Sequence, residues 1–437
     1  MKKIVPAFLL ALLVLLPQAA RSMSFEDERK LAREVVTSLD AQGLLVEDQE
    51  VARPVKMLSE KLADHVRKPI YAFNVHVIND RTVNAFTIPD GHIFVNVGTL
   101  LFARDLDELA AVIGHEMAHA QLRHIPQAYE QQSQITAASI LGVVLGALAA
   151  SKNPQAGAAL IFSSLGGGEN FKLAYTRRHE LDADDFGRKL LESSGYDETA
   201  MDRFLSRLGG ITGGKNFPEY LLTHPTSTNR LSGLSPDAKK PRPDGYYWTL
   251  QAGVAGVLLP PEEGTQRAQA MPEPYRKLAL AMIETNRGRS ADALTLLAGV
   301  NLPLADTYRG INLALLGRKD EAYPLLKSYG GTARAQMALA EILEGRGEYG
   351  EAIRALLSYQ KKDVKVDYRL GILYEKSKRQ TLSHVSFARY FFKTGKRPAA
   401  VFHIDKALEA KQDLEPGMED ELKEMVENFP GLVGIRP

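Results

Sequence analysis

Five consecutive residues combine two imidazoles with a carboxylate in a spacing that suits metal chemistry: His115-Glu116-Met117-Ala118-His119. Residues four apart lie on one face of an α-helix, so His115 and His119 can reach the same metal ion. Glu116 is turned about 100° away from His115 and can act on an attacking water without becoming a ligand. The pattern predicts the core of a zinc metallopeptidase.

The residues before the motif predict the helix that it needs. Asp105 and Glu108 have the spacing of a capping box that opens a helix. A buried stripe follows at helical spacing, formed by Leu109, Val112, Ile113 and Met117. The alternative is an ordinary amphipathic helix with two surface histidines. Buried histidines beside a glutamate are costly without a partner, which favours the metal site.

Two histidines leave a catalytic zinc short of a ligand, because such sites usually use three protein ligands. His124 is a poor third ligand, since it follows His119 by five residues, about 140° around a continuous helix. The metzincin pattern would require a glycine and a histidine where this chain has Leu122 and Ile125. That class is therefore excluded.

A helix predicted near residues 171–194 carries the better candidates. Glu180 and Asp184 are four apart and share a face, so we expect Glu180 to be the third metal ligand. Asp184 would accept the second ring N–H of a ligating histidine. Gly187, about one turn further on, would allow close helix packing. A solvated acidic face paired with neighbouring arginines is the alternative.

His224, in Thr223-His224-Pro225, has three possible roles. Its imidazole could stabilise the oxyanion that forms during acyl transfer. It could instead be a fourth metal ligand that silences the enzyme until it is displaced. It could also be a simple loop histidine before a proline. We take the first role, a catalytic one, as the working prediction, and we treat the histidines away from these motifs as structural or surface residues.

The N-terminus predicts export. Lys2 and Lys3 precede an apolar run over residues 4–16, and small residues then suggest signal-peptide cleavage after Ser22. The run has 13 residues, fewer than the roughly 20 that span a bilayer, so removal is favoured over an uncleaved anchor. The expected location is the periplasm, with at most peripheral membrane contact.

Composition narrows the class further. The chain has no cysteine, so disulfides and lipid attachment at cysteine are excluded, and a metal site must use nitrogen and oxygen ligands. Lys and Arg number 54 against 53 for Asp and Glu, a net charge of +1. With this balance, the sequence gives no indication of a basic surface that would bind nucleic acid.

The first predicted domain, residues 23–235 after a signal peptide at 1–22, contains a small sheet. Residues 71–78 and 92–97 alternate as strands around a Pro89-Asp90-Gly91 turn, and the metal helix follows. We expect an extended substrate to pair with the strand at 92–97. The apolar segment 135–165 predicts a buried helical hairpin, or else a movable cover or membrane-touching element hinged at the glycines that follow.

A Pro-rich linker or docking segment is predicted at 236–274, and helical repeats at 275–437. Each repeat carries a Gly, a polar run and an Ala at the sixth position. Copies occur at 288–293, 317–322 and 347–352, with a weaker one at 395–400. The first three are about 30 residues apart and resemble degenerate tetratricopeptide repeats, which bind partners on a concave face. A generic helical bundle is the alternative.

Four separated motifs resemble the M48 family of zinc metallopeptidases, which are gluzincins. The resemblance spans residues 25–235 and implies one zinc ion held by His115, His119 and Glu180, with Glu116 and His224 catalytic and Asp184 in support. It also implies an α+β fold, a mostly helical gluzincin domain with a small sheet, here followed by an all-α solenoid. The motifs are Asn84-Ala85-Phe86 with 89–95, His115–His119 with His124, 175–184, and Thr223-His224-Pro225 with Arg230.

The order of signal peptide, peptidase domain and repeats is similar to that of periplasmic members of this family. That likeness implies a zinc metalloendopeptidase that degrades misfolded or stalled outer-membrane proteins and contacts their assembly machinery. The alternative is a chaperone-like scaffold of outer-membrane assembly with a largely latent metal site.

Overall fold

A computed structural model describes residues 23–131, 142, 146, 177–210, 220, 224, 241–359, 364–410 and 414–427. The predicted signal peptide and glycine hinge lie outside these residues, as does the apolar 135–165 segment apart from Gly142 and Gly146. The chain divides into two compact units. The first comprises residues 1–46 and 52–247, and the second comprises 47–51 and 248–437.

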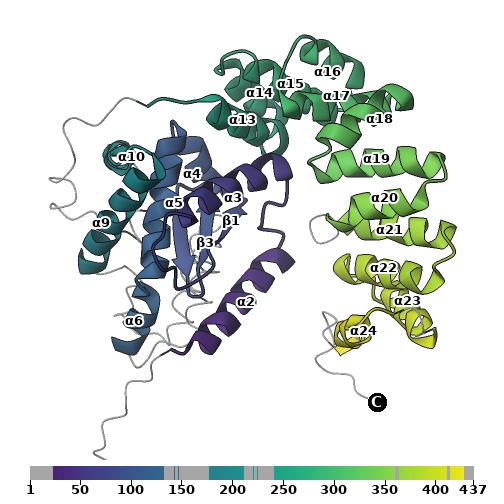
Figure 1. Cartoon of the computed structure of the whole chain (residues 1–437), viewed down its shortest axis with the longest axis horizontal. Coiled ribbons are helices and arrows are strands. Elements are labelled where there is room, and N and C mark those ends of the chain that lie inside the picture. Colours follow the sequence, from purple (N-terminus) through teal and green to yellow (C-terminus); the bar gives the residue numbers. More distant parts are fainter. Residues whose placement is uncertain are drawn as a thin grey trace, which may run out of the picture. The chain divides into compact units, whose positions relative to one another are not determined.

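The first unit is α+β, as expected from the sequence (Figure 1). In chain order, the elements that lie wholly or mainly within it are α2 (Phe25–Ala41), α3 (Gln49–Ala63), β1 (Asn74–Ile78), β2 (Ala85–Ile88), β3 (His92–Asn96), α4 (Val97–Phe102), α5 (Leu106–Gln121), α6 (His124–Gln131), α9 (Arg177–Ser194) and α10 (Ala200–Gly209).

The three strands form one sheet in the order β1-β3-β2. β3 runs parallel to β1, with Val75 opposite Ile93, and antiparallel to β2, with Phe86 opposite Phe94. Both sides of β3 are therefore paired, and the prediction that an extended substrate pairs with residues 92–97 is wrong. In the described part of the chain no strand pairs with the outer side of β2.

The turn between β2 and β3 explains this order. Asp90 and Gly91 adopt φ values of 66° and 75°, which reverse the chain within three residues and make β2 and β3 a hairpin. A Cβ atom at Gly91 would lie 2.6 Å from the Ala72 carbonyl oxygen, so only glycine fits. The sequence predicted the turn, but it placed no strand at residues 85–88.

Each face of the sheet is covered by helices. Leu31, Val35 and Leu39 of α2 form a core with Phe94 and neighbouring isoleucines. By strand alternation the opposite face of β3 is turned toward α5, which packs on both β2 and β3. On its other side α5 packs against α9 and α10. The metal helix is thus buried between the sheet and two further helices.

At the start of α5, one of the two hydrogen bonds of the predicted capping box is present. The Asp105 side chain accepts a hydrogen bond from the Glu108 backbone N–H at 2.9 Å, which caps the helix. Glu108 instead accepts the Arg104 N–H at 2.8 Å. Its carboxylate also faces Arg203 and Arg207 of α10, which ties α10 to the start of the metal helix.

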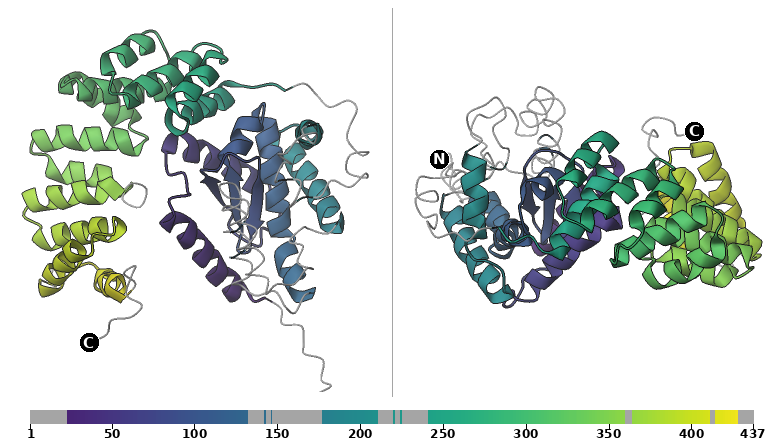
Figure 2. Two further views of the ribbon diagram at one scale, coloured as in Figure 1. Left: turned by 180° about the vertical axis from the view of Figure 1, so that it is seen from behind. Right: turned by 90° about the horizontal axis from the view of Figure 1, so that it is seen from above.

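The second unit is all-helical. Its elements, beginning within α13, are α13 (Gly245–Gly253), the π-helix η1 (Val254–Leu258), α14 (Pro261–Gln269), α15 (Tyr275–Asn286), α16 (Ser290–Leu297), α17 (Pro303–Leu315), α18 (Lys319–Tyr329), α19 (Ala333–Gly345), α20 (Tyr349–Leu357), α21 (Val364–Lys376), α22 (Gln380–Lys393), α23 (Arg397–Glu409) and α24 (Met418–Glu427). Figure 2 shows α19 to α23 stacked as successive antiparallel helices.

Most of the predicted linker at 236–274 is helical, over Gly245–Leu258 and Pro261–Gln269. Ala252, Ala255 and Ala268 from this stretch are fully buried in the core of the second unit. The division between the units falls between Tyr247 and Trp248, inside the segment that the sequence marked as a linker. Pro260 and Pro274 directly precede α14 and α15, and Pro261 opens α14.

The repeated glycines form one kind of turn. Gly288, Gly317, Gly347 and Gly395 have φ between 69° and 79° and follow the ends of helices α15, α17, α19 and α22. Lys378, with φ 61°, ends α21 in the same way. In each turn the N–H of the next residue bonds to a carbonyl five positions back, as Arg379 does to Tyr374 at 2.8 Å. The sequence missed the copy at 378 because its turn residue is a lysine.

No helix among the described residues combines the length and apolar character needed to cross a lipid bilayer.

Candidate metal centre

Four side chains from three parts of the chain converge in the first unit. One ligand atom from each of His115, His119, Glu180 and His224 lies within 4.8 Å of the others. All four side chains are almost completely buried. The two histidines are one turn apart on α5, Glu180 is in the first turn of α9, and His224 lies beyond α10. The structure therefore brings together every metal ligand predicted from the sequence, with His224 added.

The donor set fits zinc. His115 Nε2 lies 3.0 Å from His119 Nε2, and Glu180 carboxylate oxygens lie 3.5 Å from each of these nitrogens. His224 Nδ1 lies 3.1 Å from Glu180 Oε1. Three imidazoles converging on one buried carboxylate bring lone pairs together, an arrangement that a divalent cation stabilises. Nitrogen and oxygen donors in a tetrahedral set are typical of zinc.

The electrostatics of the cluster have identifiable causes. Burial lowers the pKa of His119 well below its usual value, and the neighbouring His115 lowers it further. Burial also opposes protonation of His115, but contacts with Asp184 and Glu180 raise its pKa to about 9. Burial would raise the pKa of Glu180, yet His224 and His115 hold it well below its usual range. Glu180 is therefore anionic at neutral pH.

Asp184 lies where the sequence expected it. Its Oδ1 is 3.0 Å from His115 Nδ1, the ring nitrogen that faces away from the cluster. Such a carboxylate fixes the orientation of a ligating histidine. Gly187, one turn further along α9, lies against the backbone of Gly114 and His115. A Cβ atom there would be 3.5 Å from the His115 nitrogen, so α9 approaches α5 closely at this point.

Glu116 is fully buried beside the cluster without belonging to it. Its Oε1 lies 3.3 Å from His224 Nε2. His224 thus has one ring nitrogen among the ligand atoms and the other against the predicted general base. His224 is also completely buried, with 0% of its surface exposed.

Tyr220 was not singled out in the sequence. Its ring stacks on the His224 ring at a centroid distance of 4.5 Å, and its carbonyl accepts the His224 N–H at 2.8 Å. Its own N–H donates to the Val83 carbonyl at 3.2 Å, just before β2. Tyr220 therefore links His224 to the sheet. A lone tyrosine four residues before a histidine carries no sequence signal that would have revealed this.

His124 and His179, which the sequence analysis set apart from the ligands, also lie at the centre. His124 Nδ1 is 2.8 Å from His119 Nδ1. The His124 and His179 rings stack at 4.3 Å with an angle of 12° between their planes. Both residues are buried. His124 is not one of the four clustered residues. Because α5 ends at Gln121, the argument from a continuous helix does not apply to it.

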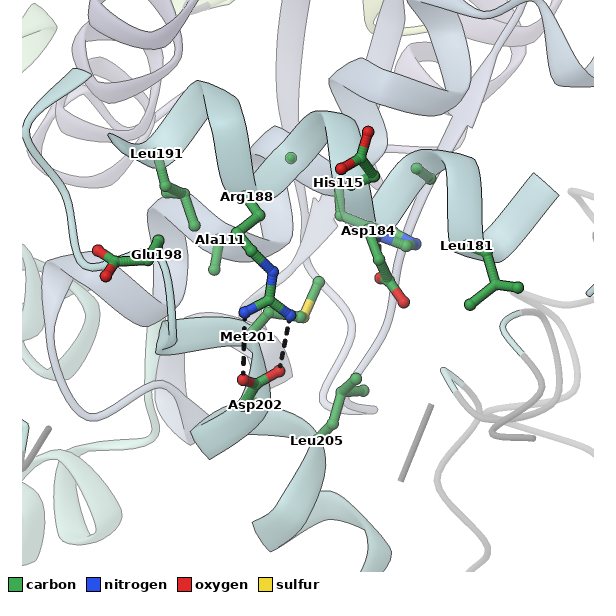
Figure 3. Close-up of a pocket in the computed structure, with 13 residues that line it drawn as sticks. Ala111, His115, Leu181, Asp184, Arg188, Leu191, Glu198, Met201, Asp202 and Leu205 are labelled. Atoms are coloured by element: carbon green, nitrogen blue, oxygen red, sulfur yellow. Dashed lines mark hydrogen bonds and ion pairs between the residues drawn. The ribbon is translucent and has the colours of Figure 1, made fainter. Parts of the chain in front are cut away.

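A pocket of about 230 Å³ lies where α5, α9 and α10 meet. His115 and Asp184 lie side by side in its wall, and Arg188 faces Asp202 across it (Figure 3). Neither Glu116 nor Glu180 lines it. This pocket therefore reaches the Asp184 carboxylate behind the His115 ring, and the Asp184 side chain is 21% exposed. It does not reach the face where the ligand atoms converge.

Comparisons with known proteins agree with this geometry. Residues 48–237 match peptidase family M48. The chain is 30% identical to the beta-barrel assembly-enhancing protease of Yersinia pestis over 229 residues, 52% of this chain and 46% of that protein. It is 28% identical to the Escherichia coli K12 protein of the same name over 226 residues, with the same shares.

A eukaryotic relative also matches. The chain is 30% identical to the mitochondrial metalloendopeptidase OMA1 of Arabidopsis thaliana over 213 residues, 49% of this chain and 41% of that protein. The chain thus spans less than half the length of the curated relatives it matches. The matched region contains the whole four-residue cluster. Together these findings show that residues 48–237, which contain the candidate metal centre, are similar to peptidase family M48.

Proposed function

We propose that this chain is a zinc endopeptidase of the periplasm that degrades misfolded or stalled envelope proteins, in particular outer-membrane proteins. The buried cluster of His115, His119, Glu180 and His224, with Glu116 against it, is the observation that carries the proposal. The names of the bacterial relatives support the connection with β-barrel assembly. Export by a cleaved signal peptide at residues 1–22 is part of the proposal.

Each residue has a proposed role. Zinc, held by His115, His119 and Glu180, would polarise the scissile carbonyl and make water a better nucleophile at neutral pH. Glu116 takes a proton from the attacking water and passes it to the leaving amine. Its complete burial strengthens every charge interaction in which it takes part. Asp184 holds the His115 ring, and His224 donates to the oxyanion of the substrate.

The substrate would be bound in an extended form along β2. This strand has an open outer side in the described residues and packs against the metal helix. Added as a further strand, a polypeptide gains main-chain hydrogen bonds with little demand on its side chains. Such weak selectivity suits an enzyme that acts on unfolded or misassembled proteins of many sequences.

The helical unit would dock partners. Its helix pairs recur with the same turn and are similar to tetratricopeptide repeats, which present a concave face to proteins. We propose that this unit contacts the outer-membrane protein assembly machinery. The chain's net charge of +1 gives no electrostatic reason to expect nucleic acid as a partner.

The test is zinc content and casein cleavage of the purified mature chain, beside Glu116→Gln and His224→Ala. The proposal expects one zinc ion per chain and cleavage that Glu116→Gln abolishes while retaining the metal. A wild-type chain without bound zinc, or undiminished cleavage by Glu116→Gln, would contradict it. Lower cleavage by His224→Ala supports the oxyanion role.

A second candidate function rests on His224. Its Nδ1 lies 3.4 Å from His115 Nε2 and 3.1 Å from Glu180 Oε1. As a fourth ligand, His224 would occupy the position that substrate needs in a catalytic zinc site. The protein would then act mainly as a scaffold with a latent site. Higher casein cleavage by His224→Ala than by the wild type favours this reading. A Glu116→Gln strain with full cellular function would favour it too.

A further inference from the structure

The two histidines on α5 are oriented by different partners. His115 Nδ1 faces the Asp184 carboxylate at 3.0 Å, the usual arrangement for a metal-binding histidine. His119 Nδ1 meets an imidazole nitrogen, His124 Nδ1, at 2.8 Å. A carboxylate therefore orients His115, and an imidazole orients His119.

Metal binding through His119 Nε2, together with the short distance between the two Nδ1 atoms, determines where the protons lie. His119 directs Nε2 toward His115 Nε2 and Glu180, so this nitrogen must carry a lone pair to bind a metal. A neutral imidazole then has its proton on Nδ1. That N–H can only donate to a lone pair, so His124 accepts with Nδ1 and carries its own proton on Nε2.

The chain places His124 by a break in the helix. α5 ends at Gln121, and Arg123 adopts φ 54° before α6 begins at His124. The Arg123 guanidinium donates to the Met23 carbonyl at 3.0 Å and pairs with the buried Glu28 carboxylate. These contacts hold a backbone conformation that is unfavourable for arginine. The reversal returns His124 toward His119, which a continuous helix would not do.

A second contact fixes the plane of the His124 ring. The ring stacks on His179, which immediately precedes Glu180 on α9. With 2% and 8% of their surfaces exposed, His124 and His179 are shielded from water that could replace either contact. His124 thus connects a ligand on α5 to the segment that carries the ligand on α9.

We propose that His124 is a positioning residue that accepts the His119 Nδ1–H, fixes the tautomer and orientation of that ligand, and so sets the affinity of the site for zinc. It does this as a neutral acceptor, without adding a further carboxylate to Glu116, Glu180 and Asp184. The inference rests on the proposed function only in requiring that zinc binds at this cluster.

A pair of variants with the same shape tests the proposal. Asparagine and leucine have the same number of side-chain heavy atoms and the same branching at Cγ, and both remove the stack on His179. Only asparagine offers an acceptor, its Oδ1, near the position of the His124 Nδ1 atom. Zinc affinity is measured by chelator competition on the full chain, with the visible spectrum of the cobalt-substituted protein as a report on ligand geometry. Circular dichroism and the unfolding temperature monitor the fold.

We expect His124→Leu to bind zinc about 10- to 100-fold more weakly than the wild type, the usual cost of losing such a partner. His124→Asn should recover most of that loss and keep the cobalt spectrum of the wild type. If His124→Leu does not fold, His124→Gln replaces it, because its amide lies one bond beyond the contact and the same loss is expected.

Equal zinc affinity in the leucine and asparagine variants would overturn the inference. If both match the wild type, the contact has no effect on the metal, and if both are equally weakened, packing and not hydrogen bonding is responsible. These outcomes leave the proposed function intact, because they still require zinc in the wild type. A wild-type chain that binds no zinc would overturn both.

Discussion

The two units of this chain are assembled from contacts of opposite range. In the first unit, the candidate metal centre joins residues that are far apart in the chain, with His115 and His224 separated by 109 positions. In the second, the same turn recurs at residues 288, 317, 347 and 378, and neighbouring helices make most contacts. Each repeat is stabilised by the repeats next to it, so a destabilising substitution affects mainly those neighbours. A site built from distant buried polar groups fails when one of them changes.

Glu116→Gln should have the largest effect, and on activity alone. The amide keeps the shape of the buried side chain but cannot take a proton from water, so peptide cleavage should fall by about 10²- to 10⁴-fold or more. Zinc content and unfolding temperature should stay at wild-type values. A peptide cleavage assay with zinc analysis checks this, and a parallel loss of zinc would mean that Glu116 acts as a ligand.

Arg203→Met should have the largest effect on stability. The guanidinium is 8% exposed and donates to Asp197 at 2.5 Å and to Asp105 at 3.1 Å. Removing the cation leaves buried carboxylates uncompensated, which costs about 3–5 kcal/mol of unfolding free energy. Urea denaturation measures the loss.

The matched control for Arg203 is a surface pair on α9. Arg178, 82% exposed, pairs with Asp182 one turn on. Arg178→Met should cost less than about 1 kcal/mol because water screens the pair. Equal losses in Arg203→Met and Arg178→Met would show that the buried network contributes no more than a surface ion pair.

The repeat turns should respond weakly and in opposite directions. Gly347 has φ 75° and open space at its Cβ position, so Gly347→Ala should cost about 1 kcal/mol from backbone strain alone. Lys378 occupies the equivalent turn at φ 61°, and Lys378→Gly should stabilise the chain by up to about 1 kcal/mol. Thermal unfolding compares the two. A destabilised Lys378→Gly would mean that the lysine side chain makes a contribution larger than the strain.

The smallest effect should be a change in pH dependence within the sheet. Burial and the neighbouring His92 lower the pKa of His76 to about 4. Between about pH 6.5 and pH 4, His76 is therefore protonated in the unfolded chain but neutral in the folded protein. The free energy of unfolding consequently falls as the pH is lowered through this range.

His76→Phe removes the titrating group while a ring can still stack on Phe94, which lies 4.9 Å from the His76 ring. We expect the variant to lose less stability than the wild type between pH 7 and pH 4.5 in urea titrations. The other histidines titrate in both proteins, so the difference isolates the His76–His92 contact. An unchanged pH dependence would contradict the assignment.

Much of the site could be predicted because its parts are local patterns. His115, Glu116 and His119 share one helix, and Glu180 and Asp184 share another, so helical spacing alone predicts which side chains face together. The α+β class and the helical C-terminal half followed from the same kind of periodicity. Substrate pairing was wrongly assigned to β3 because alternation identifies a strand but not its neighbours in a sheet.

By itself, then, the sequence determined the chemistry available: which residues can bind zinc, which carboxylate can move a proton, and which helices carry them. Only the tertiary structure decided what surrounds those groups. The reversal at Arg123 turns His124 back onto His119, and long-range packing buries His224 against Glu116. Such contacts depend on where distant segments meet in space, and no short-range spacing in a chain encodes that position.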